Sequence, residues 1–236
     1  MTTEIRQPFR YADTDWPIRE TTIAAHRMSW ELIARPGRWW SGAERVAIAA
    51  VTRAAAEYQP APDDTPLPEA AIHAVQKLVV DNANLSREWY EEMIAQPGMS
   101  DARYVELVAV VVHAFSIDEF HRGLSLPLEP LPEPVAGEPS RVRPELAEQR
   151  DSWPPLVPRA GLNASDGMLY GPWEWGANVI SALSLVPENV RWLHDLSEGH
   201  YLSFAEMRMP DPLRAISRPQ IELIAARVSA LNECFY

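Results

Sequence analysis

The sequence predicts an all-α fold, in which helical bundle lobes related by a weak internal repeat are joined by a proline-rich crossover. Apolar residues recur at helical spacing along most of the chain, and no run alternates apolar and polar residues between turn residues, as a half-buried strand would. Nine of the 22 prolines fall between residues 127 and 158. Because proline lacks a backbone N–H and disfavours helix in the residue before it, this stretch is expected to be extended.

The first helix is predicted over residues 19–34, where Ile23, His26, Trp30 and Ile33 share one stripe. Ser41 is suited to cap the second helix, and Ser100 or Asp101 to cap the longest one. Glycine and proline end several of the segments. The helices predicted after the first are 42–58, 67–82, 87–96, 100–124, 172–186, 187–207 and 217–233.

Three segments follow from this pattern: a helical lobe over 1–125, a proline-rich linker or arm over 126–165, and part of a second lobe over 166–236. Residues 48–58 align with residues 224–234 at an offset of 176, which places Tyr58 where Cys234 falls. If this is a true duplication, the two helices should occupy equivalent places in similarly arranged lobes.

Composition excludes several classes of partner. The net charge of −12 predicts neither a nucleic-acid partner nor an anionic membrane partner, since both need a basic surface. The single cysteine cannot form an internal disulfide, so a cytoplasmic location is expected. The polar N-terminus lacks the apolar core of a signal peptide, and the longest apolar run, 107–115, is too short to span a bilayer.

The last predicted helix carries the residues that point most directly to chemistry. A stripe of large apolar residues is predicted to be buried, and a second set of small residues would let another helix approach closely. Glu222 stands early in this helix, where periodicity alone indicates a solvated glutamate favoured by the helix dipole. Cys234 follows twelve positions later. The apolar stripe is Ile221, Ile224, Val228 and Leu231, and the small residues are Ala225, Ala226, Ser229 and Ala230.

This pattern resembles the alkylhydroperoxidase D-like (carboxymuconolactone decarboxylase-like) family, whose core motif reads roughly Glu, eleven residues, Cys-x-x-Cys-x-x-x-His. Glu222 matches the glutamate and Cys234 the first cysteine. The sequence ends at Tyr236, one residue before the place of the second cysteine. Tyr236 stands where the best-known branch of the family has a histidine. The chain is therefore expected to be truncated within the motif.

The resemblance extends more weakly to residues 39–125, as a degenerate first copy with Val46 and Tyr58 in place of the glutamate and the cysteine. It implies thiol-dependent reduction of a hydroperoxide, in which one thiolate forms a sulfenic acid and a second thiol resolves it. It assigns Cys234, Glu222 and Tyr236 to catalysis. It implies no metal or organic cofactor, a thiol or dithiol electron donor, and a homo-oligomer. Without the second cysteine, this chain is expected to be incomplete and inactive.

Contact between Glu222 and Cys234 requires a turn, because twelve residues of straight helix span roughly 18 Å. Asn232 is predicted to make that turn in a left-handed C-cap conformation. Two other functions are open: a non-catalytic helical module for oligomerisation or partner binding, and a lyase of the carboxymuconolactone decarboxylase type, which would use His and Glu on a lactone-type substrate.

Two histidine-containing stretches are the remaining candidates, and neither predicts a metal site. His113 and His121 lie eight residues apart with Glu106 and other acids nearby. The apolar run around His113 favours a core histidine, and His121 is expected at a solvated helix end. Residues 192–200 hold two histidines and two acids without the His-Glu-x-x-His order of zinc proteases.

Overall fold

The computed structural model describes residues 8–11, 14–211 and 214–232, and its described part confirms the all-α prediction. No strand forms among these residues, and the only β-type pairing between them is an isolated antiparallel bridge between Glu148 and Leu156. None of the helices in the described part is both long and apolar enough to cross a membrane.

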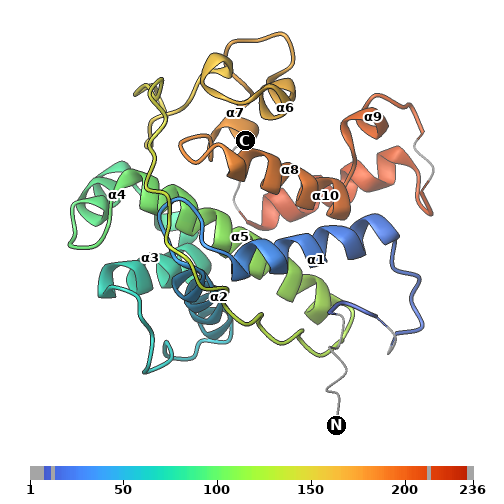
Figure 1. Ribbon diagram of the computed structural model, residues 1–236. Helices are drawn as coiled ribbons and strands as arrows, with labels where there is room; N and C mark the ends of the chain where they lie inside the picture. Colours follow the sequence, from blue (N-terminus) through green and yellow to red (C-terminus); the bar gives the residue numbers. More distant parts are fainter. Residues whose placement is uncertain (1–7, 12–13, 212–213, 233–236) are drawn as a thin grey trace.

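The first five helices lie close to their predicted positions (Figure 1). Side-chain caps explain several of their starts: Ser41 and Glu44 form a capping box, and the Ser100 hydroxyl accepts a hydrogen bond from the Arg103 N–H at 3.1 Å. These helices are α1 (Glu20–Ala34), α2 (Gly42–Ala56), α3 (Glu69–Val80), α4 (Arg87–Ile94) and α5 (Asp101–Gly123), with a 3₁₀ turn η1 (Asn82–Asn84) before α4.

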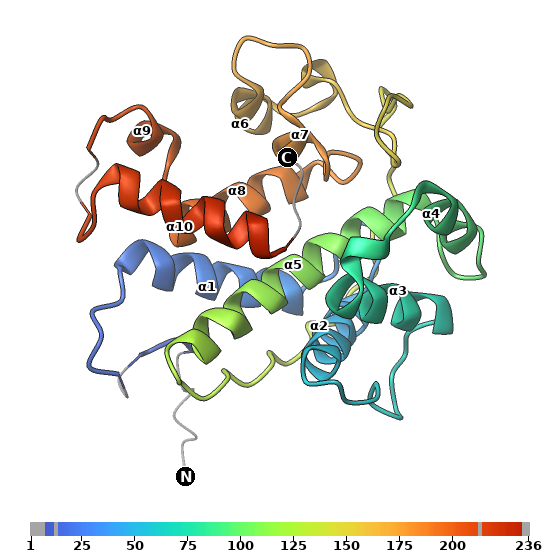
Figure 2. The same ribbon diagram turned by 180° about the vertical axis from the view of Figure 1, so that it is seen from behind.

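Helix α5 is the centre of the molecule. It packs against α2 and α3 on one side and against α1 and α8 on the other, as Figures 1 and 2 show from opposite directions. Its apolar run is buried on nearly all sides: Leu107, Val110 and Ile117 have no exposed surface. A helix that is apolar all round is buried all round, which accounts for its place between two layers of helices.

The C-terminal part is more broken than the sequence predicts. Only a short helix forms within the predicted 172–186 segment, and Gly171, just before this segment, adopts a positive φ of 64°. The predicted 187–207 helix is interrupted at Tyr201, and a new capping box on Ser203 and Glu206 starts another turn. The elements are η2 (Arg159–Gly161), α6 (Ala164–Gly167), η3 (Met168–Tyr170), α7 (Asn178–Ser181), α8 (Glu188–His200), α9 (Phe204–Met207) and α10 (Arg218–Leu231).

Helix α8 connects the two ends of the sequence. It lies along α1, and the Gly199 carbonyl accepts hydrogen bonds from the Thr22 hydroxyl at 2.6 Å and the Arg19 guanidinium at 2.7 Å. A Cβ atom at Gly199 would lie 2.7 Å from the Ala25 Cβ, so a larger residue would push the helices apart. One buried core contains residues from before and after the proline-rich arm. The segment boundaries proposed from the sequence stay predictions.

The proline-rich arm has no helix between residues 126 and 158, as its composition predicts. It is nevertheless fastened to the helical body by hydrogen bonds. The Trp30 indole N–H donates to the Pro130 carbonyl at 2.8 Å, and the Val135 N–H donates to the Ala34 carbonyl at 2.8 Å. These bonds satisfy backbone groups that an extended segment cannot satisfy internally.

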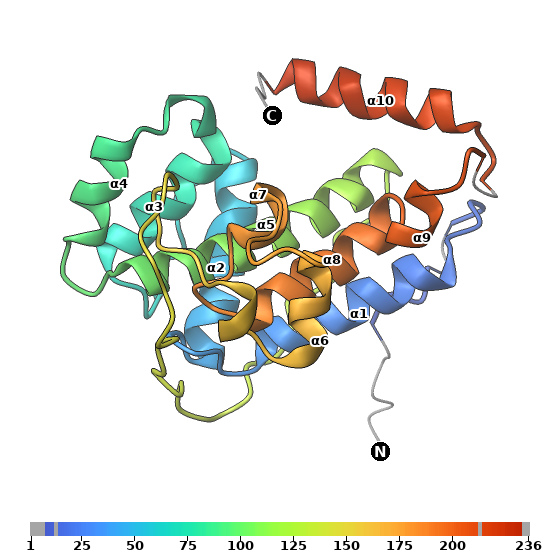
Figure 3. The same cartoon turned by 90° about the horizontal axis from the view of Figure 1, so that it is seen from above.

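Helix α10 lies on the outside of the molecule, apart from the central layers (Figure 3). None of its residues is buried, so the predicted buried stripe is wrong: Ile224, Val228 and Leu231 are exposed. The expected equivalence with α2 is not met either. Helix α2 is covered by α1, α3 and α5, and no described helix covers α10 in the same way.

Candidate functional site

Glu222 lies in the second turn of α10, where its carboxylate is held by two donors. The Tyr201 hydroxyl donates to Glu222 Oε2 at 2.8 Å, and the Arg218 guanidinium, four residues earlier on the helix, donates to Oε1. These two hydrogen bonds hold the pKa of the carboxyl below its ordinary value. The carboxylate is therefore ionised at neutral pH and accessible from the solvent.

The other two residues assigned by resemblance, Cys234 and Tyr236, lie outside the described residues. Helix α10 ends at Leu231, and Asn232 has φ −91° and ψ 10° rather than the predicted left-handed conformation. The prediction for Asn232 is therefore wrong. Its side-chain amide donates to the Val228 carbonyl at 3.0 Å, which satisfies one of the free carbonyl groups at the helix end.

His113 is a core histidine, as predicted from its apolar surroundings. It has no exposed surface, its Nδ1 donates to the Ala109 carbonyl at 2.7 Å, and its ring stacks on Trp192 with centroids 3.7 Å apart. Burial lowers its pKa to about 4. No group of three or more potential metal ligands forms within the described part of the chain.

His121 is buried, so the prediction of a solvated helix end is wrong. It belongs to a cluster with Tyr11, His26 and His200, which joins the middle of α1 to the C-terminal ends of α5 and α8. The His121 Nδ1 donates to the Pro127 carbonyl at 2.7 Å, because a carbonyl can only accept. Its Nε2, in the neutral ring, then accepts from the Tyr11 hydroxyl at 3.0 Å.

The order of donors continues through the cluster. The Tyr11 oxygen accepts from His26 Nδ1, and His26 Nε2 accepts from His200 Nε2 at 2.6 Å. This order requires a neutral His26, because its Nε2 has to accept a hydrogen bond. Burial, aided by the nearby His200 ring, lowers the pKa of His26 to about 3. Burial, aided by the charge of Arg19, lowers the pKa of His200 to about 4.

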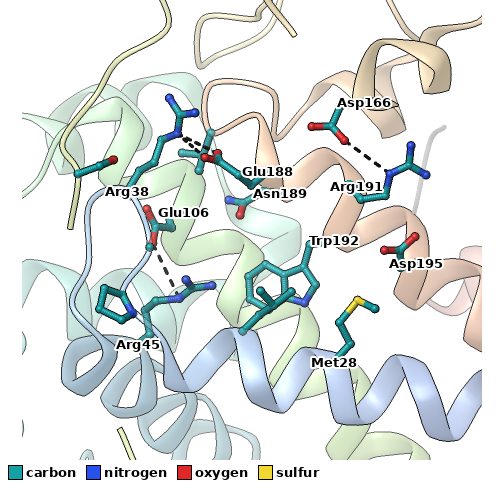
Figure 4. Close-up of a pocket in the computed structure, with 15 residues that line it drawn as sticks. Met28, Arg38, Arg45, Glu106, Asp166, Glu188, Asn189, Arg191, Trp192 and Asp195 are labelled. Carbon is teal, nitrogen blue, oxygen red and sulfur yellow. Dashed lines mark hydrogen bonds and ion pairs between the residues drawn. The ribbon is translucent and has the colours of Figure 1, made fainter. Parts of the chain in front are cut away.

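A cavity lies elsewhere, between α1, the loop after it, α2, α5 and α8 (Figure 4). Its volume is about 420 Å³, which is within the range of small-molecule sites. Met28, Leu32, Pro36 and Val186 supply apolar lining. The polar lining includes Arg38, Arg45, Glu106, Glu188, Asn189 and Asp195.

A buried pair of opposite charge lies at one end of the cavity. Arg45 Nε and Glu106 Oε1 are 3.9 Å apart, and neither atom has a hydrogen-bond partner. Glu106 Oε2 accepts from the Trp39 N–H at 2.7 Å. The loop passes so close over this carboxylate that a Cβ atom at Gly37 would lie 1.7 Å from Glu106 Oε1. Burial raises the pKa of the Glu106 carboxyl despite the nearby guanidinium.

The other charges of the cavity are mostly paired. Arg38 binds both oxygens of Glu188 at 2.8 Å, and Arg191 lies 3.5 Å from Asp166. The fourth acid, Asp195, makes no ion pair with any described arginine, and burial raises its pKa. Arg45 also lies over the Trp192 ring, 4.9 Å from its centroid, as a cation–π contact.

Sequence reasoning selected Glu222 as a candidate and did not point to this cavity. Its lining residues come from seven segments between Met28 and Asp195, and none of those segments carries a motif. The one available signal was the apolar α5 run interrupted by Glu106, since a charged residue there must find a buried partner.

Comparison of this chain with protein-family models, with curated proteins and with solved structures gives no match.

Proposed function

We propose that the end of α10 serves thiol-dependent reduction of hydroperoxides, with Cys234 as the reacting thiol and Glu222 as the group that carries protons. The observation that supports this best is the Glu222 carboxylate, which is ionised, accessible and fixed in place by Tyr201 and Arg218. Because Asn232 does not make the predicted left-handed turn, the ionised carboxylate is proposed to receive the thiol proton through water rather than by direct contact. The resemblance to the alkylhydroperoxidase D-like family supports the same assignment.

The proposed reaction has two steps. The Cys234 thiolate attacks one peroxide oxygen, the O–O bond breaks, and Cys234 becomes a sulfenic acid while an alkoxide leaves and takes up a proton as the alcohol. An added thiol then attacks the sulfenic sulfur, forms a mixed disulfide and releases water. Tyr236 is proposed as a proton donor to the alkoxide. Tyr201 is a positioning residue, which holds the Glu222 carboxylate.

The first prediction concerns peroxide consumption. Because the chain holds a single cysteine, it should consume at most about one equivalent of cumene hydroperoxide per chain when no thiol is added. Trapping with dimedone and mass spectrometry should place the sulfenic acid on Cys234. Cys234→Ser should abolish the reaction, and Glu222→Gln should slow it about tenfold or more.

Glu133→Gln is the matched control, since Glu133 is exposed on the proline-rich arm, and it should react at the original rate. Sustained turnover by Cys234→Ser, or an unchanged rate in Glu222→Gln, would show that the chemistry lies elsewhere.

A second candidate function is self-association through α10, which the exposed apolar residues of this helix favour. Leu223 is 70% exposed, Ile224 55%, Val228 52% and Leu231 64%. Apolar patches of this kind are commonly buried between subunits. One helix presents both these large residues and the small Ala226 and Ala230, so two copies related by a two-fold axis have complementary surfaces to pair.

The second prediction is that the protein is a dimer or higher oligomer at tens of micromolar, measured by sedimentation equilibrium. Replacing two apolar residues, Ile224→Lys with Val228→Glu, should shift the mass toward the monomer because it buries charges in the contact. Glu133→Lys, at an exposed position on the proline-rich arm, should leave the mass unchanged. A monomeric mass for the original chain at these concentrations would contradict the association.

A further inference from the structure

The cavity beside α8 contains more unsatisfied hydrogen-bonding capacity than a structural void would. Four polar atoms around it are buried without a partner: Arg45 Nε, Glu106 Oε1, Asn189 Nδ2 and Trp192 Nε1. Buried polar groups in folded proteins are nearly always bonded, and each exception destabilises the fold. Their concentration around one cavity indicates a partner that occupies it.

Asn189 is the strongest of these indications. The residue is only 3% exposed, and it lines the cavity. Its side-chain amide nitrogen has no hydrogen-bond partner. Asn189 and Trp192 are three residues apart on α8, so their side chains share one face of the helix. Figure 4 shows Asn189 and Trp192 on α8, across from Glu106 on α5 and Arg45 on α2.

Trp192 is available only at its edge. One face of the indole stacks on His113, and Arg45 lies over the ring at 4.9 Å. A ligand therefore has little ring surface on which to stack. It meets the indole through the N–H, which requires a hydrogen-bond acceptor on the ligand.

The charges of the cavity disfavour a charged ligand. Arg38, Arg45 and Arg191 are each matched by an acid, namely Glu188, Glu106 and Asp166. An added carboxylate would meet these acids without a free arginine. Near Asn189 and Glu106, an added ammonium would compete with arginines that are already paired; the unpaired acid, Asp195, lies at the other end of the cavity, near Met28 (Figure 4). Burying an unmatched charge is far more costly than burying a neutral polar group.

We propose that this cavity binds an uncharged organic molecule with a carboxamide- or lactam-type polar edge and a hydrophobic body. A carboxamide carries an acceptor oxygen beside donor N–H groups. The four buried atoms have almost no accessible surface, so small turns of these side chains must bring them to the cavity. The ligand oxygen can then accept from Trp192 or Arg45, its N–H can donate to Glu106 Oε1, and the Asn189 amide can pair with either side. The hydrophobic body would lie against Met28, Leu32 and Val186. This site is separate from the thiol chemistry proposed for α10.

The test uses three probes of one size that differ in charge: benzamide, benzoate and benzylamine. Saturation-transfer NMR with the full chain at pH 7 should show benzamide binding at least about tenfold more tightly than either charged probe. Benzoate lacks the donors for Glu106, and benzylamine lacks the acceptor for Trp192 and Arg45. No detectable benzamide binding at 10 mM, or equal binding of a charged probe, would overturn the proposal.

Two variants locate the binding. Asn189→Leu keeps the side-chain size and removes the amide, and it should weaken benzamide binding about tenfold or more. Met28→Trp fills the cavity from a partly exposed rim position without touching the buried polar atoms, so it remains informative if Asn189→Leu fails to fold. Asn178→Leu, at an exposed position on α7, is the control and should bind as the original chain does. Unchanged benzamide binding in Met28→Trp would overturn the proposal.

Discussion

Lowering the pH from 7 to 5 is expected to reduce the free energy of unfolding by up to about 6 kcal/mol, enough to bring a protein of ordinary stability close to unfolding. The cause is three buried neutral histidines, His26, His113 and His200, whose folded pKa values are about 3, 4 and 4. The unfolded chain takes up protons at these residues below about pH 6.5, and the folded chain does not.

The sign follows from this difference in bound protons. Stability is fully present above about pH 6.5 and falls as the pH is lowered toward the folded pKa values, by about 2 kcal/mol per histidine at pH 5. Glu106 acts in the opposite sense: its raised pKa means that the folded state takes up its proton first, which offsets part of the loss.

Urea denaturation at pH 7, 6 and 5 measures the effect. His26→Gln should lower the pH slope of the stability by about one proton, whatever its effect on stability at pH 7. His73→Gln is the control, because His73 is exposed on α3. A flat profile between pH 7 and 5 would show that the histidines are not buried in their neutral form.

Arg53→Met is expected to destabilise the protein by about 3–5 kcal/mol, because it leaves the Asp118 carboxylate buried without its partner. The Arg53 guanidinium binds both oxygens of Asp118 at 2.8 Å and also donates to the Glu129 carbonyl at 3.0 Å. The Asp118 side chain is only 3% exposed, so water cannot replace the arginine. This one side chain joins α2, α5 and the proline-rich arm.

Arg122→Met is the matched control. Arg122 pairs with Glu57 and Glu119, which are about half exposed, so its loss should cost less than about 1 kcal/mol. Urea denaturation at pH 7 compares the two variants. Adding Asp118→Asn to Arg53→Met should recover part of the loss, since it removes the unmatched charge. Equal costs for the two arginine variants would contradict the assignment of Arg53 and Asp118 as a buried pair.

The sequence predicted the helices whose signals are local, and it failed where the signal comes from distant contacts. Ser41 and Ser100 cap α2 and α5 as predicted, because a cap depends on residues three positions apart. His121 was misjudged because its partners, Tyr11 and the Pro127 carbonyl, come from other segments.

The same limit applies to the candidate sites. Glu222 could be selected because a short motif surrounds it, whereas the cavity at Asn189 depends on how α8 meets α1, α2 and α5. The apolar stripe of α10 was read correctly as a periodic pattern. Periodicity shows that a helix has an apolar face, but it does not show whether another element covers that face.

The pairing of α1 with α8 also delays the completion of the fold while the chain is being synthesised. His26 and His200 are 174 residues apart, so α1 remains uncovered on one side long after α5 has been made. At about 5–20 residues per second, synthesis from the end of α5 to the end of α8 takes about 4–15 s. Throughout this interval the α1 face around Ala25 and His26 is open to chaperones and to neighbouring nascent chains.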